Sequence, residues 1–170
     1  MRQNLFQNKN RFVKPQIRTH QEMKFIGVEV RTSYKLESSQ EKARIPALQQ
    51  KFQAEQIEDQ IPNRIDSDLH FAIYTKYKTD HRGPFSFILS AEVSTLDTIP
   101  EGMVGVTVPT SKYLVFTAEG RMPDALEKAW KDVRIYFANN IDYQRAYTAD
   151  FEVHDKECPD VVDVYIAVKD

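Results

Sequence analysis

The pattern of apolar and polar positions predicts a chain built mostly of short strands. The clearest case is the stretch Tyr147–Val168, in which apolar and polar residues alternate on both sides of a polar turn. A second pair, His70–Lys76 and Phe85–Val93, is separated by the turn-rich sequence KTDHRGP and is predicted to form a hairpin. Further strands are predicted at residues 12–20, 24–31, 103–108 and 112–118.

Two stretches change to the helical period. The first has Pro46 in a position that suits an initial helical turn, and it ends at Pro62-Asn63. The second starts at Pro123 and closes at Asn139-Asn140. The apolar stripe of the first helix is Ile45, Leu48, Phe52, Ile57 and Ile61, and that of the second is Leu126, Ala129, Trp130, Val133 and Phe137.

The elements follow the order strand, helix, strand, strand, and then the same order again. This order predicts one domain over residues 12–170, made of modules at about 12–95 and 103–170, after a loose polar segment at 1–11. Two similar modules generally leave a groove at their junction, where a ligand is expected. A shift of 78 residues supports the repeat, because it places Phe52 on Trp130, Tyr74 on Glu152, Phe87 on Tyr165 and Ile88 on Ile166.

Charge argues against a dedicated nucleic-acid binder. The 170 residues include 23 basic and 25 acidic side chains, for a net charge of −2. Basic residues dominate 1–35 and acidic residues dominate 150–170. A basic arm for DNA is one interpretation. The spacing of the basic residues among apolar ones favours the other, in which the two ends lie near each other and complement in charge.

The sequence shows few signs of catalysis, metal binding or membrane insertion. Cys158 is the single cysteine, so no intramolecular disulfide can form. The histidines His20, His70 and His81 lack metal-ligand spacing, and no GxSxG, HExxH or phosphate-binding glycine loop occurs. We therefore expect no cofactor and no turnover of ordinary esters, phosphates or peptides. No apolar run approaches membrane-spanning length, so we expect a cytoplasmic protein without membrane contact.

Glu152 is the acidic residue with two open interpretations. It lies between Phe151 and Val153 in a predicted strand, so it is either a solvated outer residue or an acid presented to a cavity. His154 shares its face and could be its partner. Aromatic residues on strands, among them Tyr74, either fill the core or line a site.

Several segments together resemble the gyrase-inhibitor-like (GyrI-like) small-molecule-binding family, the effector-binding domain of bacterial transcription activators. They are KFIGVEVRT, IPALQQKF, the hairpin IYTKY…FSFILSAEVS, IPEGM, SKYLVFTAEG, and DFEVHD followed by VDVYIAV. The resemblance runs from about Lys14 to Lys169. It implies an α+β fold, in which two strand–helix–strand–strand modules form a curved antiparallel sheet with two helices on one side. It also implies a groove between the modules, lined by aromatics around a central acid.

The resemblance places the central acid on Glu152 and the groove aromatics on Tyr74, Tyr77 and Tyr113. Where the family often has Leu-Trp after Ile-Pro, this chain has Ala47-Leu48-Gln49. Aromatic faces and a partly desolvated carboxylate favour apolar or cationic organic ligands. The full set of predicted ligand-binding residues is Glu152, Tyr74, Tyr77, Phe87, Tyr113, Trp130 and Tyr147.

The leading hypothesis is a stand-alone protein that binds small apolar or cationic organic molecules, in transcription regulation or in resistance to a toxin or drug. The family region occupies the chain and leaves no room for a helix-turn-helix, so we expect no direct nucleic-acid binding. A second hypothesis is a hydrolase of reactive cyclopropane-type toxins, with Glu152 as general base or acid. A third is an interaction protein whose partner is DNA gyrase or a regulator.

Overall fold

The computed structural model describes residues 14–140 and 142–170, so the predicted loose segment 1–11 lies outside the described residues. The helices are α1 (Tyr34–Glu37), α2 (Ile45–Ala54), the 3-10 helix η2 (Ile57–Gln60) and α3 (Asp124–Asn139). The strands are β1 (Gln16–His20), β2 (Met23–Ser33), β3 (Leu69–Thr75), β4 (Pro84–Val93), β5 (Val104–Val108), β6 (Ser111–Glu119), β7 (Ala149–Asp155) and β8 (Val161–Val168). The predicted α+β class is confirmed. The first predicted helix, which extended to Ile61, is divided into α2 and η2 at Gln56, whose φ of 50° ends the α-helix, and the short helix α1 was not predicted.

All strands belong to one antiparallel sheet in the order β1-β6-β8-β7-β3-β4-β2-β5. The β3–β7 pair lies at its centre, with β4 and β2 on one side and β8 and β6 on the other. The outer strands are exchanged between the halves: β1 pairs with β6, and β5 pairs with β2. The two-residue links 21–22 and 109–110 connect β1 to β2 and β5 to β6. Because each link joins strands at opposite ends of the strand order, the sheet must curl.

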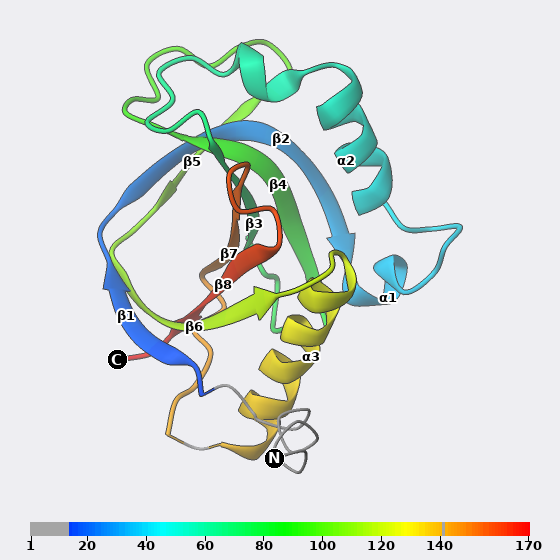
Figure 1. The fold of residues 1–170 in the computed structure, drawn as a ribbon, viewed down its shortest axis with the longest axis vertical. Coiled ribbons are helices and arrows are strands. Elements are labelled where there is room, and N and C mark those ends of the chain that lie inside the picture. The colour runs from blue at the N-terminus through cyan, green and yellow to red at the C-terminus, as the bar shows by residue number, and fades with distance from the viewer. Residues whose placement is uncertain (1–13, 141) are drawn as a thin grey trace, which may run out of the picture.

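The long helices α2 and α3 cover the same face of this curved sheet, as the resemblance implied (Figure 1). Phe52 of α2 packs with residues of β2 and β4, whereas Val133 of α3 packs with residues of β6 and β8. The curl encloses a second core on the other face, which includes Phe25, Ile73 and Phe151. Since both faces are buried, the central strands have apolar residues in consecutive positions.

The strand registers support the repeat and correct part of its alignment. Ile73 of β3 pairs with Phe151 of β7, 78 positions later, so the pseudo-twofold relation passes through this pair. Ile73 also pairs with Ile88, and Phe151 pairs with Tyr165. Ile88 therefore corresponds to Tyr165, and the predicted matches of Phe87 to Tyr165 and of Ile88 to Ile166 were wrong by one residue. Such a slip exchanges the two faces of a strand.

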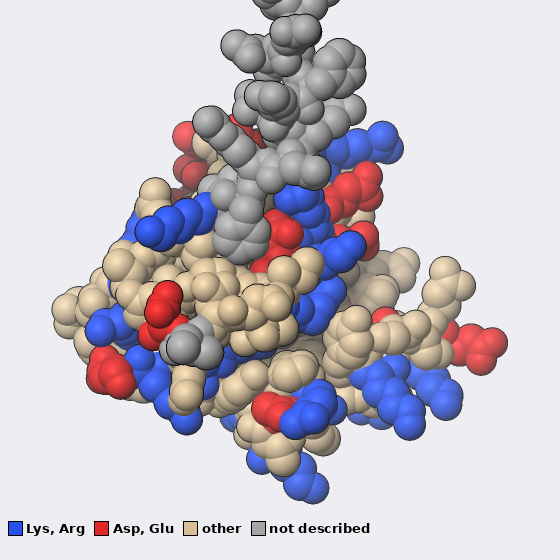
Figure 2. All heavy atoms as spheres, turned by 90° about the horizontal axis from the view of Figure 1, so that it is seen from below, with Lys and Arg blue, Asp and Glu red and all other residues tan. Residues whose placement is uncertain are grey.

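The surface and the chain ends bear on the remaining predictions. Basic and acidic side chains are interspersed over the face seen from below (Figure 2). The predicted proximity of the ends is present, because Arg18 donates to the Tyr165 hydroxyl at 3.2 Å. Among residues 14–140 and 142–170, however, no ion pair joins 14–35 to 150–170. In the same described part of the chain, no helix has the length and apolar character needed to cross a bilayer.

Candidate functional site

A pocket of about 440 Å³ lies on the helix-covered face, between the two halves of the molecule. Its walls come from α1 and the start of α2 on one side, from α3 on the other, and from β3 and the β3–β4 turn. The exposed apolar lining is much more extensive than the polar lining. The lining residues are Tyr34, Glu37, Ile45, Tyr74, Tyr77, His81, Arg82, Phe85, Trp130, Arg134 and Arg145.

Glu152 lies beneath the aromatic lining and is only 4 % exposed. Its Oε2 accepts hydrogen bonds from the Tyr74 hydroxyl and from Trp130 Nε1, both at 2.7 Å. Its Oε1 lies 2.8 Å from His154 Nε2. Ala72 is the residue opposite Glu152 in the β3–β7 ladder, and its small side chain leaves room for the acid. The sequence left Glu152 open between solvent and a cavity, and the structure buries it against the pocket wall.

Burial beside Glu152 also determines the protonation state of the Tyr74 phenol. Burial, followed by the neighbouring Glu152 charge, raises the pKa of the Tyr74 phenol well above its usual value. The phenol therefore remains protonated and acts as the donor to the carboxylate. The Tyr74 ring contacts Trp130 at a centroid distance of 4.8 Å. Two aromatic rings from opposite halves are thus held together over one buried acid.

A second buried acid, Asp150, lies two residues earlier on the same face of β7 and is fully buried. Its Oδ2 accepts from the Tyr77 hydroxyl and from the Arg145 guanidinium, each at 2.7 Å. Its Oδ1 accepts from the Ala167 backbone N–H at 2.8 Å. Unlike Glu152, Asp150 has a permanently charged cation as its partner. Burial, with the Asp150 charge, raises the pKa of Tyr77 well above its usual value.

Tyr147 connects this cluster to the β3–β4 turn. It has a positive φ of 53°, which few non-glycine residues adopt. Its hydroxyl lies 3.0 Å from His81 Nδ1, and the Arg145 guanidinium lies 4.6 Å from its ring centroid. Tyr147 thus supports Tyr77 and Arg145 from behind and is not itself part of the lining.

The structure brings together most, though not all, of the predicted site residues. Tyr74, Tyr77 and Trp130 line the pocket, and Glu152 and Tyr147 lie directly behind them. Phe87 is 1 % exposed and packs edge-on against Tyr74 at 5.2 Å, so it supports the lining from below. Tyr113 lies elsewhere, fully buried in the core on the opposite face of the sheet.

Several lining residues were not predicted from the sequence. Phe85 could have been found, because it shares a strand face with Phe87. Arg134 could also have been found, because it is one helical turn beyond Trp130. Arg145 had no sequence signal, because it lies in an irregular segment between α3 and β7. Tyr34 and Glu37 belong to the short helix α1, which the periodicity did not predict.

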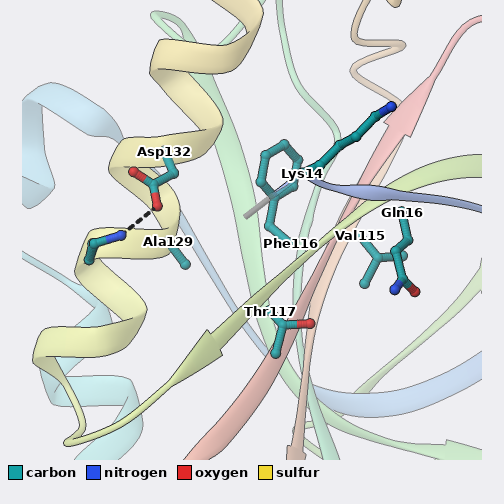
Figure 3. Close-up of a pocket in the computed structure, with 8 residues that line it drawn as sticks. Lys14, Gln16, Val115, Phe116, Thr117, Ala129 and Asp132 are labelled. Atoms are coloured by element: carbon teal, nitrogen blue, oxygen red, sulfur yellow. Dashed lines mark hydrogen bonds and ion pairs between the residues drawn. The ribbon is translucent and has the colours of Figure 1, made fainter. Parts of the chain in front are cut away.

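The other cavities of the described residues are less suited to an organic ligand. One of about 80 Å³ lies between α3 and β6, where Lys128 and Asp132 form an ion pair (Figure 3). Another of about 220 Å³ lies beside His70 and His154. A third of about 390 Å³ lies where the end of α3 meets Tyr147 and Lys169, and its lining is about as polar as it is apolar. Within residues 14–140 and 142–170, no group of three or more His, Cys, Asp or Glu side chains could hold a metal ion.

The fold is that of an effector-binding domain. The chain matches the family model described as Cass2, integron-associated effector binding protein, over residues 16–168, and it belongs to that family. Among curated protein sequences, none matches the chain.

Three solved structures illustrate the similarity. An integron cassette protein from the mobile metagenome of Vibrio cholerae is 28% identical, with a TM-score of 0.76 over 92% of this chain and 96% of that one. SAV2435 bound to tetraphenylphosphonium is 19% identical, with a TM-score of 0.71 over 92% of this chain and 94% of that chain. The C-terminal domain of EcmrR is 12% identical, with a TM-score of 0.56 over 92% and 97%. The last two matches concern the fold alone.

Proposed function

We propose that this protein binds aromatic organic molecules, cations among them, in the pocket between α2 and α3. The observation that carries the proposal is the Glu152 carboxylate, buried under the rings of Tyr74 and Trp130 at the wall of an apolar pocket of about 440 Å³. That volume falls within the range of small-molecule sites.

The chemistry of the lining favours such ligands for two reasons. The faces of Tyr and Trp rings attract a cation through the ring quadrupole, by about 0.5–2 kcal/mol each. Glu152 adds a negative charge behind two of these rings. Its Oε2 has only the neutral partners Tyr74 and Trp130, and His154 contacts the other oxygen, Oε1. The rings also bind neutral aromatic molecules through stacking, with few directional requirements. A pocket of this kind suits chemically varied ligands.

The family and one neighbour support this proposal. The family description names effector binding, and SAV2435 has a fold similar to this chain and is bound to tetraphenylphosphonium, an aromatic cation. We also propose that ligand binding by this protein serves transcription regulation or resistance to a toxin or drug.

The hydrogen bonds that Glu152 already accepts favour a binding role over hydrolysis. Oε2 already accepts two hydrogen bonds and Oε1 contacts His154, so the acid lies behind its donors and is not part of the lining. A general base must reach the proton that it removes. A gyrase or regulator partner would instead be detected by co-purification.

Thermal shift with tetraphenylphosphonium, followed by calorimetry, tests the proposal. Saturation at about 100 times Kd should add about 2.7 kcal/mol, which raises Tm by roughly 5–10 °C in a domain of this size. Trp130→Ala should weaken binding by about 2- to 30-fold through loss of the cation–π contact. Ile135→Ala, on an exposed position of the same helix outside the lining, should leave binding unchanged. Absence of any shift with this cation and with a library of aromatic compounds would reject the proposal.

A further inference from the structure

The arginines that line the pocket differ in whether an acid neutralises them. Arg145 forms an ion pair with the buried Asp150. Arg82 binds both carboxylate oxygens of Asp80 through its Nε and a terminal nitrogen. Arg134 forms no ion pair with any residue of 14–140 or 142–170. Its charge is therefore available to a ligand, whereas the other two are already balanced.

Among the described residues, none of the other ionisable groups in or behind the lining forms an ion pair with Arg134. Both oxygens of Glu37 accept hydrogen bonds, from the Thr32 hydroxyl and from two backbone N–H groups at the start of α2. Burial lowers the pKa of His81 below its ordinary value, so its ring is neutral at pH 7. Glu152 is held behind Tyr74 and is occupied by its own donors.

Arg134 is also held in place at the edge of the pocket. It follows Trp130 by one turn on α3, so both side chains lie on the same face of the helix. Its guanidinium lies 5.5 Å from the ring centroid of Tyr34 on α1, across the pocket from α3. Tyr34 and Arg134 are both exposed, and we call the side of the pocket that they form the mouth. A guanidinium stacked on a ring keeps the N–H donors of its edge free for a carboxylate.

We propose that the ligand of this pocket carries an acidic group at the end that lies at the mouth, and that Arg134 binds this group. The inference rests on the proposed function, because it names the class of molecule that the same pocket takes. The aromatic body lies against Tyr74, Tyr77 and Trp130, where a cationic ring system is accepted. The acid lies against Arg134, in a fork geometry that carboxylates match. The ligand class is thus an aromatic acid, or an amphoteric aromatic molecule whose acid is on a side chain.

Three probes that share one ring system and one chain length test this inference. They are 1-pyrenebutyrate, 1-pyrenebutyramide and 1-pyrenebutylamine, whose chain ends are negative, neutral and positive. Their Kd values are measured by fluorescence titration on the wild-type chain and on Arg134→Gln, Arg134→Lys and Lys131→Gln. Lys131 is the matched control, because it is an exposed cation of the same helix that does not line the pocket.

We expect the wild-type chain to bind the acid roughly three- to tenfold more tightly than the amide, as an ion pair at an open mouth allows. Arg134→Gln should remove this preference while the amide keeps its Kd. Arg134→Lys should retain part of it, and Lys131→Gln should retain all of it. The preference should shrink between 50 and 500 mM NaCl, because salt screens exposed charges.

Two outcomes overturn the inference, and they are distinguishable from each other. If the amide and the amine bind while the acid binds no more tightly, or if Arg134→Gln keeps the preference, the role of Arg134 is wrong and the proposed function survives. If none of the three probes binds and tetraphenylphosphonium also fails to bind, the proposed function falls together with the inference.

Discussion

Replacing Glu152 by glutamine removes a buried charge with almost no change in shape. The amide oxygen can still accept from Tyr74 and Trp130, whose donors lie 2.7 Å from Oε2 in the wild-type chain. We therefore expect the fold to be kept. Hydrogen bonds to a charged group contribute about 1.5–3 kcal/mol and neutral ones about 0.5–1.5 kcal/mol. The loss of about 1 kcal/mol per donor is partly offset, because a neutral amide costs less to bury than a carboxylate.

The effect on a cationic ligand should be larger than the effect on folding. A cation on the Tyr74 ring would lie roughly 7 Å from the carboxylate, where an effective dielectric constant of about 20 corresponds to about 2 kcal/mol. Loss of that attraction raises Kd by about 30-fold. A neutral aromatic ligand has no such attraction, so its Kd should change by less than about threefold.

Calorimetric titration of tetraphenylphosphonium and of the neutral triphenylphosphine oxide against both proteins measures this difference. Urea unfolding of each protein without ligand shows whether Glu152→Gln has kept the fold. If the cation binds both proteins equally while the variant remains folded, Glu152 does not contribute to ligand binding. The carboxylate would then serve only to hold the two rings in position, and the electrostatic reasoning would be refuted.

Two further predictions concern stability. Asp150→Ala leaves the Arg145 guanidinium, whose side chain is 7 % exposed, without its carboxylate. The free energy of unfolding, measured with urea, should therefore fall by about 3–5 kcal/mol. Asp150→Ala combined with Arg145→Met should recover part of this loss. Equal stabilities of the single and double variants would contradict this. Burial, and then the charges of His154 and Lys156, lowers the pKa of His70 from 6.5 to about 4. Between these values the unfolded chain binds a proton that the native chain does not, so the free energy of unfolding should fall by up to about 3 kcal/mol as pH decreases from 7 to 4. His70→Phe should flatten this dependence in urea titrations at pH 7 and 4.5, and an unchanged slope would exclude His70 as its source.

Periodicity was sufficient to predict the main elements, because an alternating strand and an amphipathic helix each have a local signature. The second helix was predicted from its apolar stripe, and Pro123 and Asn140 are the residues that flank α3 in the structure. The helix α1 has four residues and no buried side chain, so no periodic pattern could reveal it. For that reason the sequence did not predict that Tyr34 lines the pocket.

The choice of face was decided by tertiary structure. Alternation places Tyr113 and Leu114 on opposite faces of β6, but both are buried, because helices cover one face and the curled sheet closes over the other. The resemblance placed Tyr113 in the site, and the local sequence could not correct it, because it cannot tell which of two apolar faces meets the helices. The one-residue slip in matching Phe87 to Tyr165 arises because paired residues are 15 positions apart in the β3–β4 hairpin (Ile73 and Ile88) and 14 apart in the β7–β8 hairpin (Phe151 and Tyr165), so one constant offset cannot fit both strands.

The sequence indicated one of the buried charges near the pocket but not the others. The sequence indicated Glu152 as a candidate, by its place between two apolar residues and by its resemblance to a family acid. It contained no sign that Asp150 and Arg145, although only five residues apart, would form a buried pair, because Arg145 lies in an irregular segment whose path no periodic pattern predicts. The burial of this pair depends on distant residues that contact Asp150, namely Tyr77 and Ala167 of β8, and no local pattern encodes those contacts. Residue types and periods determined the elements of this protein, and the curl of its sheet determined which side chains meet in the pocket.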